Sequence, residues 1–194
     1  PIHVFGNPCE VDKIQAVADA HGLKVIYDAA HAVGVDYGGQ PLLNYGDISA
    51  TSFHATKMLN TAEGGGCVAK TEELHERLKE IRFFGYNDRK EIVRNGFNGK
   101  MTEVHAAVGI ANLKYLPQAL ADRKKKYMLY RLALESCPGV AFQKINKSCN
   151  YSYFPVILPS EAMLLKVEHA LRNQNIFSRR YFYPSVNRYT ELVP

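Results

Sequence analysis

Two polar side chains stand where hydrophobic stretches of the sequence give way to small residues. Lys57 lies within SFHATKMLNTAEGGG, residues 52–66, ahead of three consecutive glycines. Asp28 ends the hydrophobic run in VIYDAAHA, residues 25–32. A lysine amine can form a Schiff base with an aldehyde, and a carboxylate can keep a ring nitrogen protonated so that the ring accepts electrons. Pyridoxal phosphate needs both groups, so the pair points to its chemistry.

The hydrophobic pattern around Asp28 predicts a strand–helix–strand unit. We expect a short apolar strand at 2–5, an amphipathic helix at 10–21 and a buried strand at 23–30. Gly22 stands where helices commonly end on a glycine. Such a unit favours a parallel sheet, with Asp28 at the C-terminal end of its strand, where open α/β sheets bind ligands.

The pattern continues as α/β and then changes near Pro138-Gly139. The further elements predicted before that point are strands at 46–53 and 66–69, helices at 71–83, 102–113 and 117–137, and a long polar loop at 84–101. Residues 1–137 are therefore expected to be part of a large domain with a mostly parallel sheet. Residues 138–194, with a strand near 151–158 and a helix near 160–174, are expected to be part of a smaller α+β domain.

Composition and charge indicate an ordinary globular protein. Hydrophobic residues make up 46% of the 194 residues and charged residues 22%, and no apolar run approaches the ~20 residues of a membrane span. No signal peptide is visible, so a cytoplasmic location is expected. The four cysteines show neither CxxC nor zinc-ligand spacing, which favours reduced thiols over redox or metal chemistry.

The charge is unevenly distributed along the chain. The net charge is −3 over residues 1–70 and +8 over residues 71–194. A basic half suits an anionic partner, and both a nucleotide-linked sugar and a nucleic acid would fit. No basic motif with interleaved aromatic residues supports nucleic-acid binding. The run of basic residues at 123–126 is expected to be a solvated helix face.

Three segments together give the chain a specific resemblance. DAAHA at 28–32, SFHATK with its following glycines, and GFNGKMTEVHAAVG at 96–109 resemble the sugar aminotransferases of the DegT/DnrJ/EryC1/StrS family, which have the aspartate-aminotransferase-like fold. The resemblance extends from about Val4 to Pro184. The family usually has GEGG where this chain has AEGG at 62–65, a difference that leaves Lys57 intact. Because the resemblance begins partway through the family's large domain, the chain looks like a fragment.

The resemblance implies roles for individual residues, and each residue also has a plainer structural interpretation. Lys57 would form the Schiff base, although most loop lysines are only exposed. Asp28 would pair with the pyridinium nitrogen rather than only cap a turn. His31 would lie near the cofactor's phenolic oxygen rather than in a core, and Ser52 would bind its phosphate rather than only form a turn. Asn98 would reach the phosphate of the neighbouring subunit, unless it is simply part of a mobile loop.

The resemblance also implies a function. The protein would be a pyridoxal-phosphate-dependent aminotransferase that acts on a nucleotide-linked keto-deoxysugar, with glutamate as donor, in a homodimer with shared active sites. Lys100 and Tyr183 are weaker candidates for substrate contacts, and no metal is expected. Lys57 argues against the family's sugar dehydratases, in which a histidine replaces the lysine. Two alternatives stay open: a catalytically silent or regulatory member, and an incomplete domain that is inactive without its upstream segment.

Overall fold

The computed structural model describes residues 1–189, which form two compact units. The first unit contains Pro1–Ser136 and Gln143–Pro155, and the second contains Cys137–Phe142 and the chain from Val156 onward. The 143–155 segment thus returns to the first unit, while the predicted domain division between residues 137 and 138 stays a prediction. Within the described residues, no helix is both long enough and apolar enough to span a membrane.

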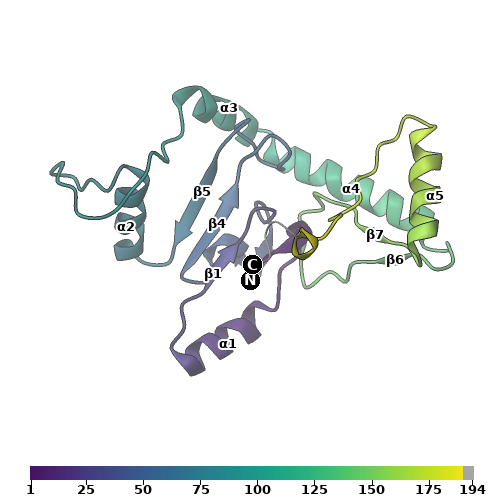
Figure 1. Ribbon diagram of the computed structural model, residues 1–194, viewed down its shortest axis with the longest axis horizontal. Helices are drawn as coiled ribbons and strands as arrows, with labels where there is room; N and C mark the ends of the chain where they lie inside the picture. Colours follow the sequence, from purple (N-terminus) through teal and green to yellow (C-terminus); the bar gives the residue numbers. More distant parts are fainter. Residues whose placement is uncertain (190–194) are drawn as a thin grey trace. The chain divides into compact units, whose positions relative to one another are not determined.

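One α-helix precedes the strands of the first unit, and its other α-helices follow them (Figure 1). Its elements are η1 Val4–Gly6, α1 Val11–His21, β1 Ile26–Asp28, β2 Asp36–Tyr37, β3 Gln40–Pro41, η2 Leu42–Asn44, β4 Ile48–Ser52, β5 Gly65–Ala69, α2 Glu72–Arg82, α3 Glu103–Leu113 and α4 Leu116–Leu134. The elements of the second unit are β6 Ala141–Phe142, β7 Val156–Ile157, α5 Glu161–Arg172 and η3 Val186–Arg188.

The sheet of the first unit has the order β1–β4–β5 and is mixed (Figure 1). β1 and β4 are parallel, with Asp28 opposite Ala50, whereas β4 and β5 are antiparallel, with Ser52 opposite Gly65. The expectation of a mostly parallel sheet therefore holds for only one of the two strand pairs within the described chain. The antiparallel pair arises because the chain turns back through residues 53–64 directly into β5, without a crossover helix.

Local sequence signals fix the ends of several helices. Gly22 ends α1 in the left-handed conformation, with φ of 62°. Hydroxyl side chains start three other helices by accepting a backbone N–H: Thr71 for α2, Thr102 for α3 and Ser160 for α5. These caps explain why the predicted helix starts lie within one residue of the observed ones.

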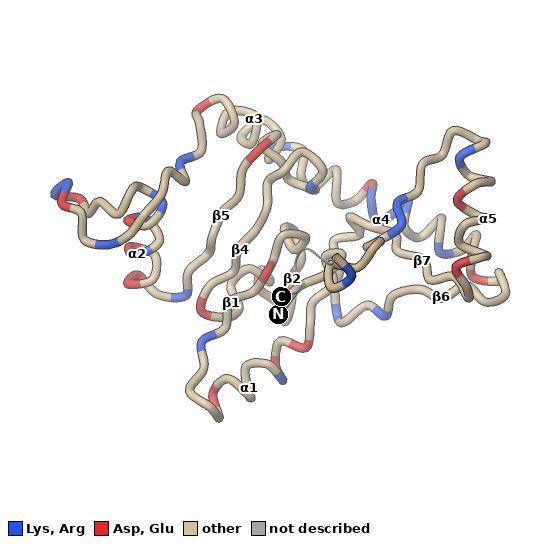
Figure 2. Tube along the Cα trace, in the orientation of Figure 1, with Lys and Arg blue, Asp and Glu red and all other residues tan. Residues whose placement is uncertain are grey.

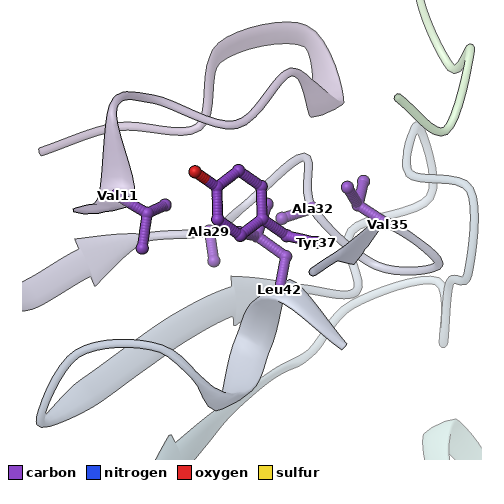
Figure 3. Packing of buried hydrophobic residues seen from close by; sticks show 6 residues of the cluster. All are labelled: Val11, Ala29, Ala32, Val35, Tyr37 and Leu42. Atoms are coloured by element: carbon purple, nitrogen blue, oxygen red, sulfur yellow. The ribbon is translucent and has the colours of Figure 1, made fainter. Parts of the chain in front are cut away.

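The buried core of the first unit lies beside the C-terminal end of β1 (Figure 3). Its members come from α1, from the loop after β1, and from the β2–β3 hairpin with its following turn: Val11, Ala29, Ala32, Val35, Tyr37 and Leu42. Ala29, Ala32 and Leu42 are fully buried. Packing on these small alanines fixes the path of the chain immediately after Asp28, because a tightly packed interior leaves little room for a shift.

The strand predicted at residues 2–5 is wrong. Only Ile2 pairs with the sheet, through an isolated parallel bridge to Asp28, and residues 4–6 form a turn of 3₁₀ helix. Phe5 has φ of 59° and Gly6 has φ of 72°, both left-handed values that no strand can contain. The turn signal in Gly6-Asn7-Pro8 therefore acts two residues earlier than the hydrophobic pattern predicts.

The second unit contains a short antiparallel pair, β6 with β7, and the capped helix α5. The strand predicted at 151–158 is confined to Val156–Ile157, and its partner β6 was not predicted. Basic residues are spread along α4 of the first unit (Figure 2). The four of them at 123–126 are exposed, as expected for a solvated helix face.

Candidate functional site

The C-terminal ends of the two parallel strands bring Asp28 and Ser52 to the same edge of the sheet. Asp28 is the last residue of β1 and Ser52 the last of β4. The two strands stay together beyond Asp28, because Ala29 N–H donates to the Ala50 carbonyl at 2.8 Å. The Thr51 hydroxyl donates to the Ala29 carbonyl at 3.1 Å from a buried position. Asp28 thus lies at the C-terminal end of its strand, as predicted, and its role in ligand binding stays a prediction.

Lys57 lies in a loop that is closed by its own hydrogen bonds. At the base of the loop, Phe53 N–H donates to the Gly64 carbonyl, and Thr61 N–H donates to the Phe53 carbonyl, both at 2.9 Å. The Thr61 hydroxyl also donates to the Glu63 carbonyl at 2.7 Å. Lys57 N–H donates to the His54 carbonyl at 2.9 Å, which forms a turn directly before the lysine side chain.

His54 organises the tip of the same loop, a role that the sequence alone did not suggest. Its Nδ1 accepts the Thr56 N–H at 3.2 Å and lies 2.9 Å from the Thr56 hydroxyl. Its Nε2 lies 3.6 Å from a carboxylate oxygen of Glu63, across the loop. Both ring nitrogens of His54 therefore contact the loop itself.

Helix α3 supports this loop from outside. The Asn112 amide donates to the Asn60 carbonyl at 3.0 Å. A Cβ added to Gly109 would lie 2.6 Å from the Thr61 methyl group, so the glycine allows the helix and the loop to touch. Gly109 of α3 thus packs against the Lys57 loop.

His31 is half-buried and held at its ring. Its Nδ1 accepts the Phe5 N–H at 3.1 Å, so the neutral ring carries its proton on Nε2. The rings of His31 and Tyr153 lie 4.6 Å apart. Burial lowers the pKa of His31, the positive charge of Lys57 lowers it further, and the Asp28 carboxylate partly opposes both effects. His31 is therefore a neutral Nε2–H donor, and the charges of Lys57 and Asp28 both affect its pKa.

A recess at this edge gathers the predicted residues His31, Ser52 and Lys57. Its other walls include residues of the loop after Asp28 and three residues of the 143–155 segment, Asn150, Ser152 and Tyr153. The Ser152 hydroxyl oxygen is buried and has no hydrogen-bond partner among the described residues. A buried polar atom without a partner calls for an explanation, and a ligand in the recess would provide one.

The donor set of the recess fits pyridoxal phosphate. It offers an amine for the aldehyde, hydroxyls for a phosphate or phenolic oxygen, and a neutral imidazole N–H. Asp28 does not line the recess directly; its side chain is exposed, and one carboxylate oxygen accepts the Ala30 N–H at 3.0 Å. The other carboxylate oxygen has no hydrogen bond among the described residues, so it could serve as the anion that a pyridinium requires.

Asn98 and Lys100, two of the residues predicted from the resemblance, do not line this recess, and a third, Tyr183, belongs to the other unit. Asn98 is exposed and forms an isolated antiparallel bridge with Phe83. The Lys100 ammonium lies over the Phe84 ring, 4.2 Å from its centroid. Tyr183 belongs to the second unit, where it lies under the Arg180 guanidinium at 3.4 Å. Their proposed ligand contacts stay predictions.

Sequence analysis did not single out the recess residues of the 143–155 segment. Ser152 and Tyr153 are separated from Lys57 by almost a hundred residues, and NYSYF has no motif that a single sequence could reveal. The buried Asn150 of this segment could not be recognised either. Asparagines rarely lie buried unless they are hydrogen-bonded, and the sequence shows neither the burial of this residue nor its hydrogen-bond partners. Only the fold brings this segment to the edge of the sheet.

Comparisons with known proteins agree with the class that this edge suggests. The sequence matches the DegT/DnrJ/EryC1/StrS aminotransferase family over residues 1–191. A protein from Shigella dysenteriae named dTDP-4-amino-4,6-dideoxy-D-glucose transaminase is 43% identical over 193 residues, which cover 96% of this chain and 52% of the relative. An Escherichia coli protein of the same name is 36% identical over 192 residues, with the same coverage of 96% and 52%. The chain spans about half the length of the curated relatives it matches.

Solved structures give the same result for the fold. The structure of DesI in the presence of its TDP-sugar product is 33% identical with a TM-score of 0.83, and the match covers 94% of this chain and 48% of that one. A family aminotransferase from Brucella abortus is 25% identical with a TM-score of 0.88, covering 98% of this chain and 51% of that one. The chain belongs to the DegT/DnrJ/EryC1/StrS aminotransferase family, and this confirms the resemblance.

Proposed function

We propose that this sequence forms part of a pyridoxal-phosphate-dependent aminotransferase that transfers an amino group to the keto group of a nucleotide-linked deoxysugar. The observation that supports the proposal most strongly is the recess that collects Lys57, Ser52 and His31 beside the end of the Asp28 strand. The relatives named as dTDP-sugar transaminases favour a dTDP-linked sugar as the acceptor. Glutamate is proposed as the amino donor.

Each residue has a defined task in this proposal. Lys57 would bind the cofactor aldehyde through Nζ and afterwards carry the proton between the substrate carbon and the cofactor. The free Asp28 carboxylate oxygen would hold the proton on the pyridine nitrogen. The His31 Nε2–H would donate to the cofactor's phenolic oxygen, and the Ser52 hydroxyl to its phosphate. When bound, the cofactor supplies the electron sink that makes the substrate proton removable.

The fixed positions of these groups support the proposal physically. The Lys57 loop, β4 and the loop after β1 are tied to one another or to α3 by backbone and side-chain hydrogen bonds. Groups held in place before the reaction need no reorganisation when charge develops, which is the usual source of electrostatic catalysis. The net charge of +8 over residues 71–194 would in addition attract an anionic nucleotide.

The proposal is tested with the full-length protein and pyridoxal phosphate. Borohydride reduction followed by peptide mapping should place the cofactor label on Lys57. A Lys57→Arg variant, which keeps the charge, should bind cofactor only reversibly and show no label. A label on another lysine would reject the assignment. Binding without amino transfer to any dTDP-linked keto-sugar would instead favour the silent member of the family.

A further inference from the structure

The buried side chain of Asn150 connects two walls of the Lys57 recess. Asn150 is only 2% exposed and lies in the 143–155 segment with Ser152 and Tyr153, far in sequence from the recess residues His31 and Lys57. Its amide nitrogen donates to the carbonyls of His31 at 2.7 Å and Val33 at 2.8 Å. Its amide oxygen accepts the Ser152 N–H at 3.2 Å. One side chain thus holds the loop that carries His31 and the segment that carries Ser152.

The surroundings of Asn150 leave it no freedom to move. A Cβ added to Gly6 would lie 2.0 Å from the Asn150 amide oxygen, so the side chain fills the space that this glycine leaves. Both hydrogens of the amide nitrogen have an acceptor, and the amide oxygen has a donor. A buried amide with all these partners is rigid, because breaking any one bond leaves an unpaired polar atom.

We propose that Asn150 is a positioning residue for ligand binding in the Lys57 recess. It holds His31 from the backbone side, while the Phe5 N–H holds the ring at Nδ1. It also sets the path of the backbone that places the unpaired Ser152 hydroxyl in the recess wall. Asn150 does not line the binding surface through a free polar group, so it acts through these neighbours. The inference rests on the proposed function, since it concerns the ligand of the same recess.

The matched control is Asn146, a second asparagine of the same segment. Its amide nitrogen donates to the carbonyls of Pro8 at 3.3 Å and Cys9 at 3.2 Å, and neither of these residues lines the recess. Asn146 therefore anchors the segment to the start of α1 without holding His31. The same substitution, asparagine to aspartate, is made at both positions. It keeps the shape of the side chain but replaces the amide nitrogen, which donates to carbonyls, by an oxygen that carbonyl oxygens repel.

The test measures pyridoxal phosphate binding by the full-length protein at a temperature where every variant is folded. Asn150→Asp should raise the dissociation constant about tenfold or more and shift the absorbance maximum of the bound cofactor, whereas Asn146→Asp should stay within about threefold of the unaltered protein with an unchanged spectrum. If Asn150→Asp is unfolded, Asn150→Ser, which retains one donor, should show the same direction at smaller size.

The outcomes separate this inference from the proposed function. Equal binding by Asn150→Asp and the unaltered protein would overturn the positioning role alone. Equal losses in Asn150→Asp and Asn146→Asp would also overturn it, because the effect would then follow from anchoring the segment in general. Absence of cofactor binding by the unaltered protein would reject the proposed function, and the positioning role with it.

Discussion

The same resemblance singled out the Lys57 recess and the loop between α2 and α3, but the two regions differ in their contacts and in the exposure of their side chains. The recess is built from residues that hold one another: the Lys57 loop is closed by backbone hydrogen bonds and supported by α3. In the other loop, Asn98 and Lys100 are exposed, and so are the apolar side chains of Ile92 and Phe97, at 70% and 61%.

This difference separates two kinds of functional residue. A side chain such as His31 can be analysed within one chain, because the Phe5 N–H and the charges of Lys57 and Asp28 that act on it belong to the described residues. In the described chain Asn98 is exposed and is held only through the backbone bridge to Phe83, and exposed apolar neighbours are typical of surfaces that another surface covers. Its predicted task, reaching the cofactor phosphate of a neighbouring subunit, is consistent with that exposure and needs a second chain to be tested.

Among the changes that test this comparison, the largest loss of activity is expected in the recess region, for Asp28→Asn. The amide cannot hold the pyridine nitrogen protonated, so the cofactor loses its strength as an electron sink. Amino transfer should slow by about 10²-fold or more, which corresponds to roughly 3 kcal/mol of barrier, while cofactor binding changes little. Single-turnover rates with glutamate check this, and a slowing below about tenfold would reject the role of Asp28.

The sequence was most informative about the recess where the residues proposed for function lie within short local sequence patterns. DAAHA and SFHATK identify Asp28, His31, Ser52 and Lys57, and the structure brings three of these side chains to one recess. Helix starts were predictable because each depends on a single hydroxyl and its neighbours three residues on, as at Thr71 and Ser160.

Long-range features could not be predicted from the sequence. The antiparallel direction of β5 depends on how the loop at 53–64 closes, and the predicted strand at 2–5 is replaced by a 3₁₀ turn with left-handed φ values at Phe5 and Gly6. The contribution of the 143–155 segment to the recess arises from packing between residues more than a hundred positions apart. A hydrophobic period reports which face is buried, but not what covers it.

The next prediction tests the loop side of the comparison by mixing two inactive variants of the full-length protein, Lys57→Ala and Asn98→Ala. If Asn98 serves the opposite subunit, mixed dimers hold one site with both defects and one intact site, so activity should return. Loss of one hydrogen bond to a phosphate should weaken cofactor binding by about 1.5–3 kcal/mol in the Asn98→Ala protein. No recovery under demonstrated subunit exchange would show that Asn98 acts within its own chain.

Acid should also distinguish the two regions. Burial is the main cause that lowers the pKa of His3, to about 4, and burial also lowers the pKa of His31, whereas residues 84–101 contain no histidine. Both folded pKa values lie below the unfolded value of about 6.5, so the stabilisation is complete above pH 6.5 and is lost as the pH falls toward 4. At pH 5 the loss through His3 should be about 2 kcal/mol, from 1.36 kcal/mol per pH unit.

Hydrogen exchange at pH 7.5 and pH 5, corrected for intrinsic rates, measures this effect. Protection should fall in peptides covering residues 25–35 and stay constant in peptides covering 84–101. His3→Gln should flatten the pH dependence. A parallel loss of protection in both regions would indicate that acid acts on the whole unit and not on the recess.

The smallest effect is expected for Ser152→Ala, which should leave stability unchanged or slightly higher but weaken ligand binding. The Ser152 hydroxyl is buried and has no hydrogen-bond partner among residues 1–189, so removing it should leave the free energy of unfolding of the ligand-free protein unchanged or slightly raise it. If the hydroxyl donates to a ligand, the same change should weaken binding by about 0.5–1.5 kcal/mol, the net value of one hydrogen bond. Urea unfolding measures the change in stability, and cofactor or nucleotide-sugar titration of the full-length protein measures the change in binding.

Ser148→Ala, in the same segment but outside the recess, is the control and should change neither stability nor binding. A lower stability with unchanged binding would mean that the hydroxyl has a structural partner instead, and the recess would then end at the Lys57 loop and the loop after β1.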